Sequence, residues 1–225
     1  LLSSRLGIPD VVCGEIERLG ASRAVILGGV NALSEEVEND LVACGIERDS
    51  IKRIAGSSRY ETSLLAAEYL LDIRGGIDGA VVATGLSFPD ALAASGLAAR
   101  LGYPILLTPK EDLPSPIRAF LNGQEVSETL VVGGVAVIAQ GIEDSLSGSL
   151  RLAGDDRYAT GVAIAEFAFA RGFQLSDTYV CTGVDFPDAL AVGPVVAASA
   201  GIQVMVRPDS VPAPTEEFFS NHCSS

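Results

Sequence analysis

Arg-Ile-Ala-Gly-Ser-Ser-Arg-Tyr-Glu-Thr at residues 53–62 returns as Arg-Leu-Ala-Gly-Asp-Asp-Arg-Tyr-Ala-Thr at residues 151–160, with six of ten positions identical. A second block, Thr-Gly-Leu-Ser-Phe-Pro-Asp-Ala-Leu at 84–92, returns as Thr-Gly-Val-Asp-Phe-Pro-Asp-Ala-Leu at 182–190, with seven of nine identical. Both blocks recur after 98 residues. Two matches at one interval indicate an internal repeat, and the fold has to be read from it.

The phase of this repeat divides the chain into one whole unit and two partial ones. The Gly-Gly-Val of 28–30 matches that of 133–135 at an interval of 105, so the first copy carries seven extra residues, as a loop or a longer helix allows. Residues 53–150 form a complete repeat module, 1–52 the C-terminal half of a repeat, and 151–225 the N-terminal half of a further repeat. Our hypothesis is that 151–225 packs with 1–52, in one chain or by exchange between chains.

Short apolar runs alternate with helical patterns along the chain. Runs bounded by glycine or proline are typical of strands buried on both faces, and they occupy residues 24–27, 80–83, 104–107, 130–132 and 202–206. Helices are expected between them, and residues 91–100 are so uniformly small and apolar that this helix should be packed on several sides. The alternation predicts an α/β fold of tandem modules, each a mostly parallel sheet with helices on both faces.

The charge balance excludes some classes of partner. With 29 acidic against 15 basic residues, the formal net charge is −14. Nucleic acids and anionic membrane surfaces are bound largely through basic residues, so neither is an expected partner. The longest apolar run, 189–206, contains Gly193, Pro194, Ser199 and Gln203. A membrane span needs about 20 apolar residues, so we predict a helix, a turn and a buried strand there, and no membrane span.

The cysteines do not form a metal-binding pattern. Cys13, Cys44, Cys181 and Cys223 include no Cys-x-x-Cys pair, which disfavours a structural zinc site. We expect buried free thiols, and a disulfide stays open as an alternative if the protein is exported. No cofactor and no metal are expected.

Two charged pairs recur with the repeat. Arg59 and Asp90 in the first copy match Arg157 and Asp188 in the second, each arginine at a helix start and each aspartate in the first turn of the next helix. Both follow strand ends, so each pair is expected at one edge of a sheet. One interpretation is an internal ion pair that fixes two helix starts. The other is a site for an anion or a sugar, because arginine recognises phosphate and carboxylate through its planar fork.

Catalytic patterns are weak in this sequence. The single histidine, His222, lies three residues before the last residue, where a frayed tail would make a poor general base. The Gly-Gly turns at 28–29 and 133–134 complete neither the spaced glycine fingerprint nor a Gly-Lys-Ser/Thr loop, so tight turns explain them better than phosphate binding. We therefore expect no enzymatic activity.

In their order, the blocks Arg-Ile-Ala-Gly-x-x-Arg-Tyr-x-Thr, Phe-Pro-Asp-Ala-Leu, Pro-Ile-Leu-Leu and Val-Val-Gly-Gly resemble the cell wall binding repeat type 2 family over almost the whole chain. The resemblance implies α/β modules that associate side by side, found in surface proteins and wall-lytic amidases of Gram-positive bacteria. It also implies a non-catalytic anchor to an anionic polymer of the wall. In that family the Ile-Leu-Leu strand is linked to polymer attachment, which here is Ile105, Leu106 and Leu107.

The expected function is thus a non-catalytic cell-wall-binding module that holds a surface or secreted protein non-covalently on anionic wall polymer, at the cell wall or extracellular surface. Expected partners are the polymer and like modules, in pseudo-symmetric or homo-oligomeric association. The candidate polymer-binding residues are Arg59, Arg157, Asp90, Asp188, Ile105, Leu106 and Leu107. Two alternatives stay open: a self-association or scaffold module without polymer binding, and an α/β enzyme for a nucleotide-like ligand in the sheet-edge crevice.

Overall fold

The computed structural model describes residues 1–222 and separates into two compact units, Leu1–Glu68 and Tyr69–Ser225. Each unit is described by itself. Among the described residues, no helix is both long and apolar enough to cross a lipid bilayer. Residues 189–206 form a helix followed directly by a buried strand, as their interrupted apolar pattern predicts.

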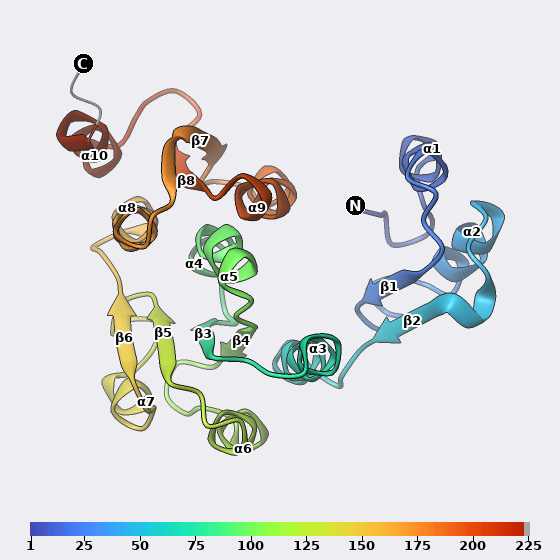
Figure 1. The fold of residues 1–225 in the computed structure, drawn as a ribbon, viewed down its shortest axis with the longest axis horizontal. Helices are drawn as coiled ribbons and strands as arrows, with labels where there is room; N and C mark the ends of the chain where they lie inside the picture. Colours follow the sequence, from blue (N-terminus) through green and yellow to red (C-terminus); the bar gives the residue numbers. More distant parts are fainter. Residues whose placement is uncertain (223–225) are drawn as a thin grey trace. The chain divides into compact units, whose positions relative to one another are not determined.

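The first unit is a two-stranded parallel sheet with helices (Figure 1). Its elements are α1 (Asp10–Arg18), β1 (Ala24–Leu27), α2 (Glu36–Ala43), the 3-10 turn η1 (Arg48–Ser50) and β2 (Ile51–Ile54). Helix α3 (Arg59–Arg74) begins in this unit and continues into the second. The core is a small apolar cluster made by Ile16, Ile26, Val37, Leu41, Cys44 and Ile46.

The cysteine expectation is wrong for the first unit. Cys13 of α1 and Cys44, which directly follows α2, form a disulfide that joins residues 31 apart in sequence. Cys181 is a buried free thiol, as expected, and Cys223 lies outside the described residues. A six-residue apolar core is small for a folded unit, so a covalent link between its two helices has a clear stabilising role.

The second unit contains the complete repeat and the start of the next. Its elements are β3 (Gly79–Thr84), α4 (Pro89–Ala93), α5 (Ser95–Leu101), β4 (Ile105–Thr108), α6 (Ser115–Gly123), β5 (Glu128–Val132), α7 (Gln140–Asp144), β6 (Ser149–Leu152), α8 (Arg157–Ala170), β7 (Gln174–Thr182), α9 (Pro187–Ser199), β8 (Gly201–Val206) and α10 (Ala213–His222). The first four strands form one parallel sheet in the order β4-β3-β5-β6, and β7 pairs with β8 in a second parallel sheet.

Helices cover both faces of the four-stranded sheet, with α4 and α5 on one side and α6 and α7 on the other (Figure 1). Its two central strands are accordingly apolar and almost fully buried, including Val81, Val82, Leu130 and Val132. The predicted α/β fold with parallel sheets and helices on both faces is confirmed. Strand β6 crosses the boundary drawn between 150 and 151, so the first strand of one repeat completes the sheet of the repeat before it.

The two repeats pack through their small-residue helices. The helix predicted at 91–100 is split at Ala94 into α4 and α5, and α5 lies against α9, its equivalent in the next repeat. A Cβ placed on Gly96 would overlap the side chain of Val196, and one placed on Gly193 would lie 2.5 Å from the hydroxyl of Ser95. Small residues therefore allow the close helix contact that the composition predicted.

Removing the disulfide should destabilise the first unit. The Cys13→Ser/Cys44→Ser variant releases a loop of 31 residues in the unfolded chain, which corresponds to a loss of about 3–4 kcal/mol in the free energy of unfolding. Amide hydrogen exchange followed by mass spectrometry should show lost protection in β1 and β2. Protection of β3–β6 serves as the internal control and should not change. Unaltered exchange in β1 and β2 would contradict the stabilising role.

Candidate functional site

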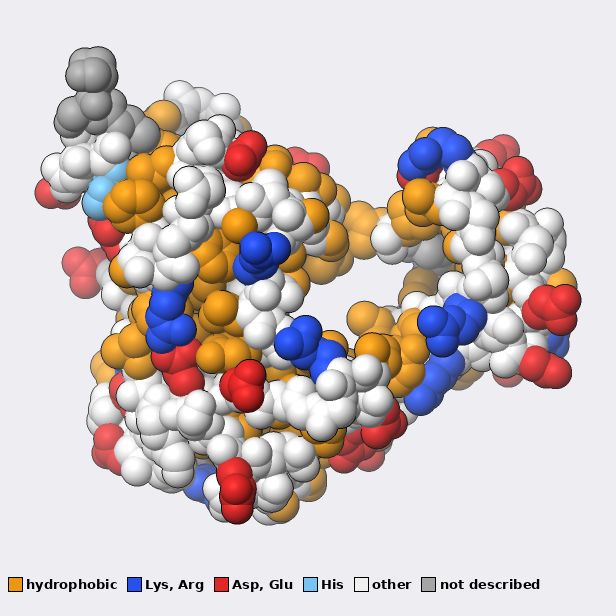
Figure 2. Space-filling view, in the orientation of Figure 1, with side chains coloured by type: hydrophobic (Ala, Val, Ile, Leu, Met, Phe, Trp, Pro, Cys, Tyr) orange, Lys and Arg blue, Asp and Glu red, His pale blue; other side chains and the backbone are white. Residues whose placement is uncertain are grey.

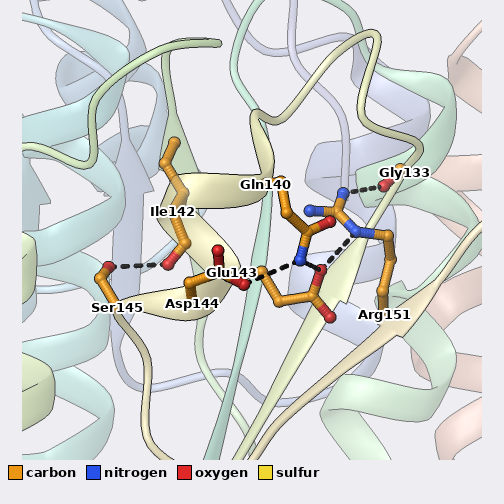
Figure 3. A network of polar contacts seen from close by, with 7 residues as sticks. All are labelled: Gly133, Gln140, Ile142, Glu143, Asp144, Ser145 and Arg151. Carbon is orange, nitrogen blue, oxygen red and sulfur yellow. Dashed lines mark hydrogen bonds and ion pairs between the residues drawn. The ribbon is translucent and has the colours of Figure 1, made fainter.

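A repeated arginine–glutamate clamp holds the turn on which the candidate site is built. Arg151 of β6 donates from Nε to Glu143 of α7 at 2.7 Å and from Nη1 to the carbonyl oxygen of Gly133 at 2.6 Å (Figure 3). The two charged side chains are only 14% and 16% exposed. Gln140 adds a 2.9 Å hydrogen bond to the same carboxylate. The clamp thereby ties the end of β5 to both α7 and β6.

The first unit contains the same clamp. Arg53 donates to Glu38 at 2.8 Å and to the carbonyl oxygen of Gly28 at 2.8 Å. Glu38 matches Glu143 at the interval of 105, whereas the arginines match at 98, so the seven extra residues lie between the two clamp members. The leading arginine of each repeated decapeptide thus has a structural role. The sequence shows that this arginine recurs, but the sequence analysis did not identify the glutamate that pairs with it.

Asp90 lies directly over the clamped turn. Gly133 has φ +114°, and a Cβ on it would lie 2.8 Å from the Asp90 carboxylate, so both the backbone and the close approach require glycine. Asp90 is 8% exposed at the start of α4. Burial raises the pKa of the Asp90 carboxyl above its ordinary value, and the guanidinium of Arg157 offsets only part of that increase.

Arg157 is placed at this carboxylate by the first turn of α8. Asp156 caps the helix by accepting hydrogen bonds from the amides of Tyr158 and Ala159, at 2.9 and 2.8 Å. Arg157 itself is exposed and donates from Nη1 to the carbonyl oxygen of Gly183 at 2.6 Å. One arginine therefore bridges the two repeats, lying near Asp90 of the first and bound to the end of β7 in the second.

The structure pairs these charges differently from the sequence prediction. The charge of Arg157 offsets part of the rise in the pKa of Asp90, which belongs to the preceding repeat. Asp188 is exposed, and its charge adds to the burial that raises the pKa of the Cys181 thiol. In the described part of the chain, Arg157 makes no direct salt bridge with either aspartate. Arg59 begins α3 in the first unit, and its predicted pairing with Asp90 stays a prediction.

Two aromatic contacts in the repeated blocks and beside Arg157 were missed by the sequence reasoning. Phe88 and Phe186, from the two Phe-Pro-Asp-Ala-Leu blocks, meet edge to face with centroids 6.0 Å apart and are 37% and 48% exposed. Arg207, which follows β8, lies 4.9 Å above the ring of Tyr158. The first repeat has Pro109 at the position of Arg207, so comparing the repeats gave no signal for it.

We name this set the strand-end site: Phe88, Asp90, Arg157, Phe186 and Arg207. Its residues follow the ends of β3, β6, β7 and β8, and the set combines exposed guanidinium groups with exposed rings. In Figure 2, Lys and Arg side chains on the second unit stand apart from one another rather than forming one basic patch. Such a surface suits local contact with acidic groups and with the apolar faces of sugar rings.

The predicted Ile-Leu-Leu contacts occupy β4, an edge strand of the four-stranded sheet. Leu106 is fully buried, Ile105 packs on the core, and Leu107 is half-buried. Leu106 thus has a place in the core, and polymer contact by this strand stays a prediction.

The sequence expectation for His222 was wrong. His222 is the last residue of α10, its Nε2 lies 2.8 Å from Glu166, and its ring lies against Phe169 and Phe218. It belongs to the packing of α10 on α8, not to a frayed tail. Within residues 1–222, no cluster of three or more histidine, cysteine or acidic side chains could hold a metal ion.

Comparison with known proteins identifies similar chains. The profile of the family "Cell wall binding domain 2 (CWB2)" matches residues 53–143 and 151–221. The chain is 33% identical over 183 residues to N-acetylmuramoyl-L-alanine amidase LytC of Bacillus subtilis strain 168, and 29% identical over 163 residues to Amidase enhancer of the same organism. These matches cover 81% and 71% of this chain but only 35% and 22% of the two relatives.

Solved structures show the same fold. Cwp8 from Clostridium difficile superposes with a TM-score of 0.82 at 27% identity, covering 97% of this chain and 37% of that one. Cwp6 from the same organism superposes with a TM-score of 0.90 at 24% identity, covering 98% of this chain and 35% of that one.

Loss of the clamp should loosen the turn beneath Asp90. Glu143→Gln leaves the partly buried guanidinium of Arg151 without its charged partner, so we expect a loss of roughly 1.5–3 kcal/mol in the free energy of unfolding by urea. Glu111→Gln is the matched control, because it removes an exposed ion pair with Lys110 in the same unit and should change little. Equal stability of the two variants would refute a stabilising clamp.

Asp90 should make stability fall as pH rises. The folded carboxyl has a higher pKa than the unfolded one. The folded state therefore holds more protons between the ordinary pKa of 3.8 and the raised pKa, and ionisation across this window costs stability. The side chain of the Asp90→Asn variant stays neutral at every pH. The free energy of unfolding of this variant should therefore rise relative to that of the parent as pH increases through this window to neutrality. Urea unfolding at a series of pH values measures this difference.

Asp188→Asn, which alters the exposed equivalent in the second repeat, is the control for this titration. Its stability should follow the parent across the same pH range. Parallel profiles for the parent and Asp90→Asn would show that the burial of Asp90 has no effect on stability.

Proposed function

Because the chain belongs to the cell wall binding domain 2 family and is a cell-wall-binding module, we propose that it anchors a surface or secreted protein non-covalently to an anionic polymer of the wall. Membership supports a location at the cell wall or the extracellular surface. The disulfide between Cys13 and Cys44 fits this setting, because disulfides persist in oxidising surroundings.

The arrangement of Arg157 carries the proposal for the site. Its guanidinium is exposed and makes no salt bridge within the described residues, so an added anion can approach it. Arg207 supplies another exposed guanidinium at Tyr158, the residue after Arg157. Phosphate or acidic sugar groups would bind these two guanidinium groups. The rings of Phe88 and Phe186 would pack against the apolar face of a sugar.

Binding of an anion by an acidic chain requires local rather than global attraction. The net charge of −14 repels a polyanion at long range, but charges separated by more than about 8–10 Å are largely screened at physiological salt. Exposed arginines at short range are therefore sufficient to hold acidic groups. Binding through them should weaken as ionic strength rises.

Association between like modules supports the alternative of a scaffold. The close contact of α5 with α9 shows that successive repeats pack on each other through their small residues. We propose that this contact positions the strand-end site, since Asp90 and Arg157 come from different repeats. A module that served assembly alone would give no reason for exposed guanidinium groups at this junction.

We also propose that this chain is non-catalytic. The enzyme alternative places a ligand in a crevice at the carboxyl ends of the strands. One depression, of about 350 Å³, lies by Val126 and Thr129 at the start of β5, the opposite end of that strand. Glu125 is the single ionisable residue among those that line it, so it offers no paired acid and base.

Co-sedimentation with purified Gram-positive cell walls tests the anchor. We expect the chain to sediment with intact walls and to stay in solution after acid treatment has removed the anionic polymer. Arg157→Ala should weaken binding by roughly tenfold, the loss of one charge-assisted contact of about 1.4 kcal/mol. The parent protein should also bind less as salt is raised.

Arg118→Ala is the matched control, because Arg118 lies on α6, across the sheet from α4 (Figure 1). It should bind walls like the parent. Equal binding to intact and stripped walls would reject an anionic polymer as the ligand. Binding lost equally in both arginine variants would reject the strand-end site.

A further inference from the structure

The depression at the start of β5 belongs to neither the clamp nor the strand-end site. It lies between the C-terminal end of α6, the start of β5 and the segment that joins α7 to β6. Its volume of about 350 Å³ is within the usual range for small-molecule sites, roughly 300–1,000 Å³. All the residues that line it come from the complete repeat, residues 53–150.

Glu125, which lines this depression, has a backbone conformation that suits glycine. Its φ is +50°, and it directly follows Gln124, the cap residue of α6. A left-handed residue after a helix cap is usually glycine, because a Cβ is disfavoured there. Gly20 occupies the equivalent position after α1, with φ +60°. Strained residues other than glycine gather at ligand sites, so the choice of Glu125 points to a role in binding rather than in folding.

The two copies of this place differ in their polar residues. Helices α1 and α6 begin and end at equivalent residues when the interval is 105, so the alignment here is direct. The apolar residues that line the depression match apolar residues in the first copy, whereas three of the four polar ones replace glycine, alanine or valine. These replacements are Gly20 by Glu125, Ala24 by Thr129 and Val42 by Ser147. The polar lining is therefore particular to the complete repeat.

The polar side chains of the depression have no partners in the fold. Thr129 is only 2% exposed, yet its hydroxyl forms no hydrogen bond within residues 1–222. Buried side-chain polar groups are nearly always hydrogen-bonded. The exposed side chains of Asn122, Glu125 and Ser147 also form no hydrogen bond or ion pair in that part of the chain. One carboxylate, one amide and two hydroxyl groups are thus available to a ligand at one place.

The charge of the depression favours a cation. Glu125 is the single ionisable residue among those that line it. The C-terminal end of α6, whose last turn contains no basic residue, adds the partial negative charge of the helix dipole. Leu121, Val126 and Leu146 supply apolar surface beside these groups. The ligand that fits this lining combines an ammonium group, hydroxyl groups and an apolar face.

We propose that this depression binds a sugar ring that carries a free amino group. Glu125 holds the ammonium group through a charge-assisted hydrogen bond. Thr129 and Asn122 bind the ring hydroxyls, and the side chains of Leu121 and Leu146 pack on the apolar face of the ring. The site shares no residue with the strand-end site, so it holds or fails independently of attachment to an anionic polymer.

Titration of the nitrogen-15-labelled chain with glucosamine, followed by NMR, tests the proposal. Glucose is the matched probe, because it has the same ring with a hydroxyl in place of the amino group. At mildly acidic pH, where the amine is protonated, we expect glucosamine to shift the amide resonances of residues 121–129 and 146–148 in a saturable way. Glucose should bind about tenfold more weakly, because it lacks the charge-assisted contact.

A linear tetramer of glucosamine distinguishes the two sources of such a ring. Tighter binding of the tetramer than of the monomer would indicate one residue of a polysaccharide as the ligand, and equal binding would indicate a free sugar. Either result supports the site.

Two variants of Glu125 separate binding from folding. Glu125→Gln should lower the affinity for glucosamine by about tenfold or more, to that for glucose. Glu125→Gly restores the residue of the first copy, so it should lose the same affinity while unfolding at the urea concentration of the parent or a higher one. Thr129→Val keeps the shape of the side chain and should weaken binding by about fivefold.

Glu111→Gln is the control, because it removes an exposed carboxylate outside the depression. It should bind glucosamine like the parent, and the amide spectrum of each variant shows that it is folded. Equal affinity for glucosamine and glucose would overturn the proposal. So would a Glu125→Gln variant that binds glucosamine like the parent, or resonance shifts confined to residues outside the depression.

Discussion

The rest of the structure depends on an arginine held between a glutamate and a turn carbonyl. Arg151 ties β6 to α7 and to Gly133, and Arg53 repeats the arrangement with Glu38 and Gly28. Removing a partly buried charge from water is costly unless all its partners are fixed, so this pair specifies one geometry of the turn. This turn leaves room for the Asp90 carboxylate only because residue 133 is a glycine and has no Cβ.

The candidate site is a product of two repeats rather than of either one. Close packing of α5 on α9 brings together blocks that lie 98 residues apart, and their phenylalanines meet at the surface. Asp90 is buried there, while the matching Asp188 is exposed. The same short sequence therefore has two electrostatic settings, because the turn at Gly133 of its own repeat lies against the Asp90 carboxylate.

The cell-wall function and the acidic composition are compatible at the scale of the site. Arg157 and Arg207 are exposed at one end of the strands, and short-range contacts survive the screening that weakens the repulsion of distant charges. The relatives LytC and Amidase enhancer are about three and more than four times as long as the stretch they share with this chain. A module of this kind supplies attachment, and its effect depends on what it attaches.

Sequence alone determined the repeat, the alternation of strands and helices, the α/β fold and the family, because apolar periodicity and motif order are local properties of the chain. It also named Asp90 and Arg157 as candidate site residues. Only the tertiary structure decided that Arg157 acts on the aspartate of the preceding repeat, that β6 completes the earlier sheet, and that Cys13 bonds Cys44. Those three facts concern contacts between segments distant in sequence. Identical local patterns allow several such pairings, and packing of the whole chain selects one.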